Sequence, residues 1–341
     1  MNLLLSEDQV QIVDTLKHFL CEEAPVARFR PPAPQIGNQD HRLLPRLAEL
    51  GFLGIAIPEE SGGIGLSSAE EMVVYREFGR HLLSPAVIGS MLGARVAAAA
   101  GDVVLLHDLL SGKARVGLGN PRGGAGIGPH CHGEFHLIES IDAPWVLCCD
   151  EQGAALLRRS DFTAIEQVHA MDHSLSLERA QLESVRPVAW VSMEQDAIYT
   201  RALVLIGAFA VGLAEATRDM AVEYAKMREQ FGKPIGSFQA IKHMCADMAI
   251  RAESALCQAA VASLTLSDHD PGAGFHGTAC KLVSIDAALK NASQNIQVHG
   301  AIGFTSEADA HLYLKRAHVM DQLWGDTRVQ RERMLHAPFA G

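Results

Sequence analysis

Residues 227–239 are the stretch that most constrains how this chain can fold, because one helix must end there and another must begin. The preceding residues, Tyr199 to Lys226, have apolar side chains at helical spacing, and the same periodicity resumes after the stretch. Gly232 suits the position that follows a helix C-terminus, Pro234 blocks continuation, and Ser237 can cap the next helix. The sequence therefore predicts a fixed corner between two long helices.

The predicted corner displays one arginine, two amide side chains and two aromatic rings. These residues are Arg228, Gln230, Phe231, Phe238 and Gln239. A guanidinium can bind a pyrophosphate, amides can bond to ribose or adenine edges, and a ring can stack on a base. These are the contacts that the ADP half of a nucleotide cofactor needs. An ordinary surface helical hairpin is the alternative that these residues alone leave open.

Three motifs, in the expected order along the chain, resemble the acyl-CoA dehydrogenase family. The corner reads Arg-x-Gln-Phe-Gly-x-Pro-Ile-x-x-Phe-Gln, which looks like one signature of that family. Residues 297–304, Gln-Val-His-Gly-Ala-Ile-Gly-Phe, resemble a second signature, and residues 50–66 match the N-terminal pattern. The resemblance implies an FAD-dependent dehydrogenase that acts on acyl-CoA thioesters.

The resemblance also implies which residues bind the cofactor. The corner residues named above, together with Ile235, Gln297 and Gly300, would bind the ADP part of FAD. Ala301 replaces the second glycine of the second signature, and we expect its methyl group to crowd the closest backbone approach. In this family the corner serves a flavin that is held mainly by the neighbouring subunit.

Helical periodicity at both ends of the chain and short apolar pieces in the middle predict the architecture. Ser6 to Gln9 reads as a capping box, and helices follow to about Leu110. The middle has apolar segments separated by Gly, Pro and Asp turns. We expect a mainly α fold with an N-terminal helical domain (1–115), a small β domain (116–191) and a C-terminal helical bundle (192–341). The resemblance implies the same order.

The composition of the chain restricts the kinds of partner that it can bind. The chain has 29 basic and 40 acidic residues, and this net charge of −11 argues against nucleic acid or an anionic membrane as a partner. The apolar run 202–216 is too short to span a bilayer, and the N-terminus lacks the basic region of a signal peptide. Seven cysteines without framework spacing indicate reduced thiols. We therefore expect a cytoplasmic protein without a membrane segment.

The chemistry implied by the resemblance needs a carboxylate base, which removes a proton α to the thioester carbonyl while a hydride leaves for the flavin. The family places this glutamate at one of two positions, which are occupied here by Trp324 and Thr200. Neither side chain can act as the base. Asp326 is the nearest substitute, although no spacing argument supports it.

The predicted β domain departs from the family pattern as well. Residues 118–126, Leu-Gly-Asn-Pro-Arg-Gly-Gly-Ala-Gly, stand where the family has a Thr-Glu-Pro-like strand and a Gly-Ser-Asp turn against the flavin ring. We therefore expect the flavin-ring pocket of this chain to be degraded or lost, while the ADP-binding corner is intact.

These observations favour a half-site, in which this chain binds ADP and a different chain supplies the flavin-ring pocket and the base. The pattern resembles the partner subunits of heteromeric acyl-CoA dehydrogenases of bacterial steroid side-chain degradation. It implies a catalytic dehydrogenase subunit in a heterotetramer, a bulky acyl-CoA substrate and an electron-transfer flavoprotein as electron acceptor. A self-sufficient homo-oligomeric dehydrogenase with an unusual base and a flavin-free assembly scaffold remain as alternatives.

The remaining motifs are better explained by structural roles than by metal binding, phosphate binding or catalysis. The histidines of segment 130–136 lack a second distant ligand pair, so we expect no metal. Segment 124–128 resembles a phosphate loop, but its glycine spacing is wrong and no helix pattern follows. No hydrolase nucleophile motif is found. Met220 and Met227 share a helix face that is typical of a bundle core. Arg201 is either structural or faces the flavin or CoA.

Overall fold

The N-terminal part of the computed structural model is helical, as the sequence predicts. The structure describes residues 3–30 and 40–336. Its first helices are α1 (Glu7–Glu23), α2 (Leu44–Glu49), α3 (Ser68–Arg80), α4 (Ala86–Ala99) and α5 (Val103–Leu110). Short 3-10 turns lie between them: η1 (Val26–Phe29), η2 (Asp40–Leu43), η3 (Phe52–Gly54) and η4 (Glu59–Ser61). Ser6 and Ser67 start α1 and α3 as the serines of capping boxes, paired with Gln9 and Glu70.

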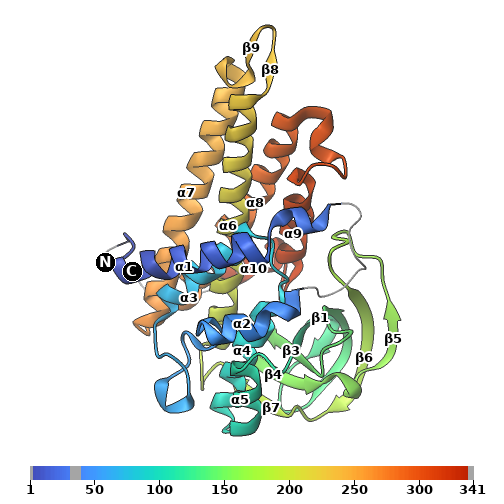
Figure 1. The fold of residues 1–341 in the computed structure, drawn as a ribbon. Helices are drawn as coiled ribbons and strands as arrows, with labels where there is room; N and C mark the ends of the chain where they lie inside the picture. The colour runs from blue at the N-terminus through green and yellow to red at the C-terminus, as the bar shows by residue number, and fades with distance from the viewer. Residues whose placement is uncertain (1–2, 31–39, 337–341) are drawn as a thin grey trace.

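The middle of the chain forms a seven-stranded sheet (Figure 1). The strands are β1 (Val116–Gly126), β2 (Cys131–Ile138), β3 (Trp145–Asp150), β4 (Gly153–Arg158), β5 (Thr163–Gln167), β6 (Leu177–Val185) and β7 (Ala189–Ser192), with the turn η5 (Arg159–Asp161) before β5. Their order is β5-β6-β2-β1-β3-β4-β7. β1 pairs with β3 in parallel, whereas the other pairs described in this sheet are antiparallel. The predicted β structure is confirmed.

One side of the sheet packs on the helices. Val116 and Leu118 of β1 belong to the large core that also contains Leu16 and Leu203. A Cβ atom on Gly89 of α4 would lie 2.9 Å from the Leu118 side chain, so α4 runs close over β1. Because this core joins all three segments, the predicted limits after residues 115 and 191 stay predictions as domain boundaries.

The C-terminal part is a helical bundle whose longest helices lie side by side (Figure 1). Its helices are α6 (Ile198–Met227), α7 (Gln239–Ser267), α8 (Ala273–His299), α9 (Ala310–Gln322) and α10 (Thr327–His336). Between them lie β8 (Glu229–Gln230), β9 (Lys233–Pro234), η6 (Ile235–Ser237) and η7 (Gly300–Phe304). The fold is therefore helical, then β, then helical, as the sequence predicts.

Helix α6 is the central element of the core. It is longer than the apolar run at residues 202–216 suggested. By its length and by the mean hydropathy of its most apolar 18 residues (1.6), it could cross a membrane. Those 18 residues are, however, entirely buried inside the molecule. Two glycines bring its backbone against α3. A Cβ on Gly212 would lie 2.0 Å from the Arg76 carbonyl oxygen, and one on Gly79 would lie 2.0 Å from that of Phe209. The burial of this helix therefore comes from other parts of the same chain.

The corner between α6 and α7 is a small β-hairpin rather than a simple helix-to-helix turn. β8 pairs with β9 across a two-residue turn, in which Phe231 and Gly232 both have positive φ (+54° and +75°). Gly232 therefore serves the hairpin and not the end of α6, which is capped by Arg228. The prediction that Ser237 caps α7 was wrong, because Phe238 occupies the N-cap position without a side-chain hydrogen bond.

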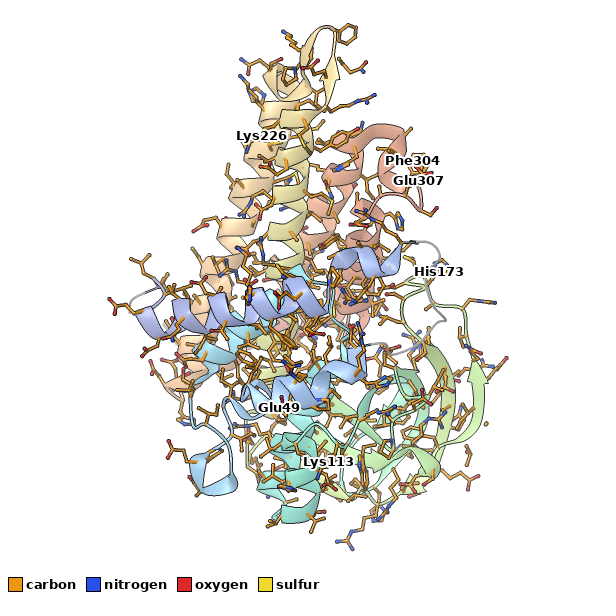
Figure 2. All side chains as sticks on the ribbon, in the orientation of Figure 1. Glu49, Lys113, His173, Lys226, Phe304 and Glu307 are labelled. Atoms are coloured by element: carbon orange, nitrogen blue, oxygen red, sulfur yellow. The ribbon has the colours of Figure 1, made fainter. Side chains whose placement is uncertain are left out.

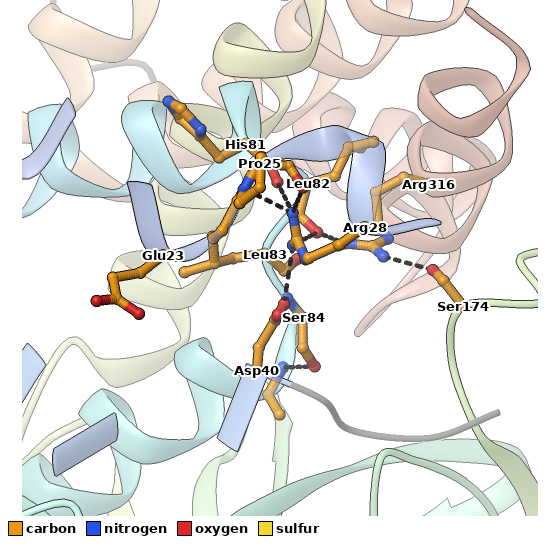
Figure 3. A network of polar contacts seen from close by, with 12 residues as sticks. Glu23, Pro25, Arg28, Asp40, His81, Leu82, Leu83, Ser84, Ser174 and Arg316 are labelled. Carbon is orange, nitrogen blue, oxygen red and sulfur yellow. Dashed lines mark hydrogen bonds and ion pairs between the residues drawn. The ribbon is translucent and has the colours of Figure 1, made fainter. Parts of the chain in front are cut away.

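A buried polar junction ties distant segments together around the turn between α3 and α4 (Figure 3). Arg28 and Arg316 both donate to the Leu82 carbonyl, at 3.2 and 3.0 Å. Arg28 also pairs with Asp40 at 3.2 Å, and Arg316 pairs with Asp172 at 2.7 Å. The turn therefore links the N-terminal segment, α9 and the loop before β6.

Candidate functional site

The hairpin at the end of α6 carries most of the predicted ADP-binding residues on an exposed surface. Arg228, Gln230, Phe231 and Gln239 are exposed, and 91% of the Phe231 surface is accessible. The half-buried Phe238 ring meets Phe231 edge-to-face at 6.1 Å and has the Lys233 ammonium 4.5 Å from its centroid. Figures 1 and 2 show this hairpin projecting at the upper end of the bundle.

The second signature lies beside the base of the same hairpin. The His299 ring, at the end of α8, stacks on Tyr224 of α6 with centroids 4.1 Å apart. Ile235 and Val298 belong to one apolar cluster that connects the two segments. Gln297 and Gly300 are exposed, and a Cβ built on Gly300 would meet no atom within 4 Å. The fold thus gathers the two signatures at one end of the bundle.

This surface has the chemistry to bind a phosphate-containing ligand or another chain. Within residues 3–30 and 40–336, the Arg228 guanidinium forms no hydrogen bond or ion pair, so its fork of donors is free. Large apolar side chains nearby are strongly exposed, among them Met227 (72%), Phe231 (91%) and Phe304 (69%). Gathered exposed apolar side chains mark surfaces that bind a ligand or another protein. Met227 is therefore not a core residue, contrary to the prediction from its spacing with Met220.

Trp324, which the resemblance places at one of the two usual positions of the base, is buried against β1. Its backbone N–H donates to Asn120 Oδ1 at 2.7 Å, and its indole N–H donates to the Gly119 carbonyl at 3.0 Å. Its own carbonyl accepts from the Tyr199 hydroxyl at 2.9 Å. The loop that contains Trp324 is therefore bonded directly to the strand that the resemblance places against a flavin ring.

Lys281 holds the same loop from inside the bundle, and sequence reasoning missed it. Its ammonium donates to the carbonyls of Leu323 and Gly325, which flank Trp324. The side chain is almost fully buried, and burial lowers the pKa of Lys281 to about 7. The only sequence signal was a lysine between apolar stretches of a long helix, which does not reveal its partners.

The other two candidate positions for a base have structural contacts. Thr200 is buried, and its methyl group would lie 2.9 Å from a Cβ on Gly277 of α8. Asp326 Oδ1 accepts the backbone N–H of Val329 at 2.9 Å, in the first turn of α10. Arg201, which the sequence left open, forms a buried ion pair with Glu71.

A pocket of about 270 Å³ remains beside the stretch that the resemblance assigns to the flavin ring. Asn120 and Arg122 line it from β1, and His318 and Gln322 line it from α9. No aspartate or glutamate is among its lining residues. Space therefore exists next to β1, but the pocket offers no carboxylate to act as a base.

The histidine, acidic and cysteine side chains of the described part of the chain are not arranged as a metal cluster or as disulfides. Within residues 3–30 and 40–336, no three His, Cys, Asp or Glu side chains are grouped to hold a metal ion. The seven cysteines have free thiols, and burial raises the pKa values of Cys148 and Cys149 well above the ordinary range. These thiols are protonated at neutral pH.

The fold defines a class of proteins in which a sheet lies between two helical parts in sequence order and an exposed hairpin projects from the C-terminal bundle. Residues 6–106 match the family model described as acyl-CoA dehydrogenase, N-terminal domain, and residues 191–337 match the one described as acyl-CoA dehydrogenase, C-terminal domain. The chain belongs to the acyl-CoA dehydrogenase family.

Two curated relatives come from Mycobacterium tuberculosis. The acyl-CoA dehydrogenase IpdE2 is 32% identical over 331 residues, which cover 96% of each protein. The acyl-CoA dehydrogenase FadE34 is 36% identical over 312 residues, which cover 86% of this chain but 42% of FadE34. The chain therefore spans less than half of FadE34.

Solved structures share the fold at low sequence identity. A chain of the ChsE4-ChsE5 complex from Mycobacterium tuberculosis superimposes with a TM-score of 0.85 at 21% identity, covering 98% of each chain. A chain of the Tcur3481-Tcur3483 steroid dehydrogenase of this family superimposes with a TM-score of 0.83 at 22% identity, covering 97% of each. At these identities the likeness shows the fold alone.

Proposed function

We propose that this chain is a subunit of an FAD-dependent acyl-CoA dehydrogenase and that it supplies the ADP-binding half of the flavin site to a catalytic partner chain. The observation that supports the proposal most directly is the projecting hairpin. Arg228, Gln230, Phe231 and Gln239 are exposed there, and the hairpin lies at the end of the bundle that is away from the sheet of the same chain (Figure 1). A ligand bound to them needs a second chain to hold its other end.

The residues at this end fit the ADP part of FAD. The free Arg228 guanidinium suits the pyrophosphate, and the amides of Gln230, Gln239 and Gln297 suit ribose or adenine edges. Phe231, Ile235 and Phe238 provide apolar surface, and the open space above Gly300 permits close backbone approach. When bound, FAD supplies the hydride acceptor of the reaction.

The flavin-ring side of this chain supports the assignment of catalysis to the partner. The pocket beside Asn120 has no carboxylate in its lining, and Trp324 is bonded to β1 where the family carries its base. The nearest acid along the chain, Asp326, caps a helix. A base within hydrogen-bond reach of substrate is a geometric requirement for proton removal.

The assembly and the substrate follow from the same proposal. We infer a heterotetramer with a catalytic acyl-CoA dehydrogenase subunit, located in the cytoplasm and independent of nucleic acid and membranes. The two-protein names of the structural neighbours ChsE4-ChsE5 and Tcur3481-Tcur3483 support a heteromer, and the description of the latter as a steroid dehydrogenase supports a bulky, steroid-derived thioester. An electron-transfer flavoprotein is the proposed electron acceptor.

The decisive experiment counts flavins. The purified chain is expected to lack visible flavin absorbance when alone, and its complex with a co-expressed catalytic dehydrogenase is expected to hold one flavin per pair of unlike chains. A lone chain that is yellow and is reduced by an acyl-CoA would instead be self-sufficient. In that case Asp326→Asn should abolish turnover if Asp326 is the base, and retained turnover would exclude it.

Arg228→Ala in the complex tests the ADP-binding role. Loss of charge-assisted hydrogen bonds, worth about 1.5–3 kcal/mol, should weaken flavin retention about ten- to hundredfold. Lys226→Ala is the matched control, because Lys226 is an exposed cation two residues away that pairs with Glu223. Unchanged flavin content in the Arg228→Ala complex would contradict the half-site and favour a flavin-free scaffold role for the hairpin.

A further inference from the structure

Another pocket, of about 680 Å³, lies in the N-terminal helical part between the end of α4, helix α5 and the turn η4. A Cβ atom built on Gly62, at the end of η4, would lie 3.9 Å from Leu110 Cδ1, so this turn faces α5 across the pocket. The volume falls within the roughly 300–1,000 Å³ of pockets that bind small molecules. Apolar side chains from the two helices form much of the wall: Ala97, Ala98, Val103, Leu106 and Leu110.

The charged and polar groups of this pocket favour a cation. Glu60 lines the pocket, and its exposed carboxylate forms no hydrogen bond or ion pair within residues 3–30 and 40–336. The described lining residues include no lysine or arginine, and the other polar side chains are those of Ser61, His107 and Ser111. An ammonium group would therefore meet a free carboxylate at the pocket wall without a lysine or arginine beside it.

The end of helix α4 adds a second attraction for a cation. Ala97, Ala98 and Gly101 place the C-terminal end of this helix in the pocket wall. The helix dipole gives that end a partial negative charge, which stabilises nearby cations. The last turn of α4 has no basic side chain that would offset this charge. The negative end of the helix and the apolar wall therefore lie next to each other.

We propose that this pocket binds a small organic ammonium ion with an apolar body, such as an arylalkylamine. The apolar body would contact Ala98, Leu106 and Leu110, and the ammonium would donate to the Glu60 carboxylate. An exposed ion pair contributes little, so burial of the apolar body would supply most of the affinity. Helix α5 lies at the opposite end of the molecule from the hairpin of β8 and β9 (Figure 1), so the ligand would leave the proposed ADP-binding surface free.

The test uses 2-naphthylmethylamine and its neutral analogue 2-naphthylmethanol, titrated by calorimetry into the full-length chain and its complex. We expect saturable binding of the amine and about two- to fivefold weaker binding of the alcohol, because an exposed ion pair contributes modestly. Glu60→Gln should remove this difference. Glu59→Gln is the matched control, because Glu59 is an exposed neighbour outside this pocket and its replacement should preserve the difference.

A second variant tests the location. Ala98 is a half-buried residue of the pocket wall, so Ala98→Phe should fill the space and abolish binding of both ligands. The proposal is overturned if the amine does not saturate, if Glu60→Gln leaves its advantage over the alcohol unchanged, or if Ala98→Phe leaves binding intact. Competition by octanoyl-CoA would also overturn it, because the pocket would then belong to the substrate site of the proposed dehydrogenase. Flavin counts separate the two proposals, since Glu60→Gln should leave them unchanged whereas Arg228→Ala should lower them.

Discussion

At the scale of single residues, Lys281 shows how one buried charge can organise a loop. Its ammonium satisfies carbonyls on both sides of Trp324, which has a positive φ of 53° that a large side chain rarely adopts. The contact removes the charged ammonium from water, and this desolvation lowers the pKa of Lys281 to about 7. The loop conformation is thus held by hydrogen bonds rather than by local preference.

Replacing Lys281 by Met should destabilise the fold by about 1–3 kcal/mol at pH 7, because the Leu323 carbonyl would be buried without a partner. The destabilisation caused by Lys281→Met should grow as pH rises. The pKa of Lys281 is about 7 in the folded protein and 10.5 ordinarily, so between these values the unfolded chain binds more protons than the folded one. The stability of the wild type therefore rises with pH in this range, whereas the variant lacks this gain. Urea unfolding at pH 7 and pH 9 measures this, and parallel pH profiles of wild type and variant would contradict the assignment.

At the scale of elements, the contact between α3 and α6 depends on the absence of two side chains. Gly79 and Gly212 let the helix backbones touch, whereas most helix pairs are separated by their side chains. Charged residues beside the crossing reinforce it: Glu215 accepts from Arg76 at 2.7 Å and from Arg80 at 3.1 Å. Helix α6 is therefore fixed in both position and rotation.

Gly212→Ala should destabilise the protein by at least about 2 kcal/mol, because the new Cβ would lie 2.0 Å from a carbonyl oxygen. Gly274→Ala is the matched control. A Cβ at that position of α8 meets nothing within 4 Å, so the gain in helix propensity should stabilise the fold by about 0.5–1 kcal/mol. Chemical denaturation measures the free energy of unfolding of both variants. Equal changes in that free energy would show that α3 and α6 can move apart without destabilising the protein.

The sequence revealed local features of these elements more readily than distant ones. The capping box at Ser6 was readable because the serine and its partner Gln9 lie three residues apart. The hairpin of Phe231 and Gly232 was missed, because Phe is an unusual residue at positive φ and gave no turn signal. The bonds of Trp324 to Gly119 and Asn120 join positions about two hundred residues apart, which no periodicity predicts.

At the scale of the whole molecule, the buried junction around the turn between α3 and α4 connects its three segments. Arg316 donates to the carbonyls of Leu82 and Leu83, to the Ser174 hydroxyl and to Asp172. A planar guanidinium is needed to reach acceptors in several directions at once. The helical parts and the sheet are therefore joined by polar contacts as well as by the shared apolar core.

Arg316→Met should cost about 3–5 kcal/mol, because it leaves the Asp172 carboxylate buried without its partner. Arg316→Lys should recover little of this loss, since one ammonium cannot replace the fork. Arg30→Met is the control: Arg30 is half exposed in its pair with Asp309, and its loss should cost less than about 1 kcal/mol. Hydrogen exchange should show that the Arg316 variant loosens β6 and the α3–α4 turn together, and loosening of only one would contradict the linkage.

The same junction also limits when the protein can finish folding during its synthesis. The Leu82 carbonyl accepts a hydrogen bond from the guanidinium of Arg316, which lies 234 residues later in the chain. At translation rates of about 5–20 residues per second, roughly 10–50 seconds separate the two groups. Until Arg316 leaves the ribosome, the Leu82 carbonyl can bond only to Arg28 and the Asp172 carboxylate only to Ser174, so the earlier helices and the sheet can form but cannot reach their final stability. The last helices of the chain thus complete a structure that was begun by its first ones.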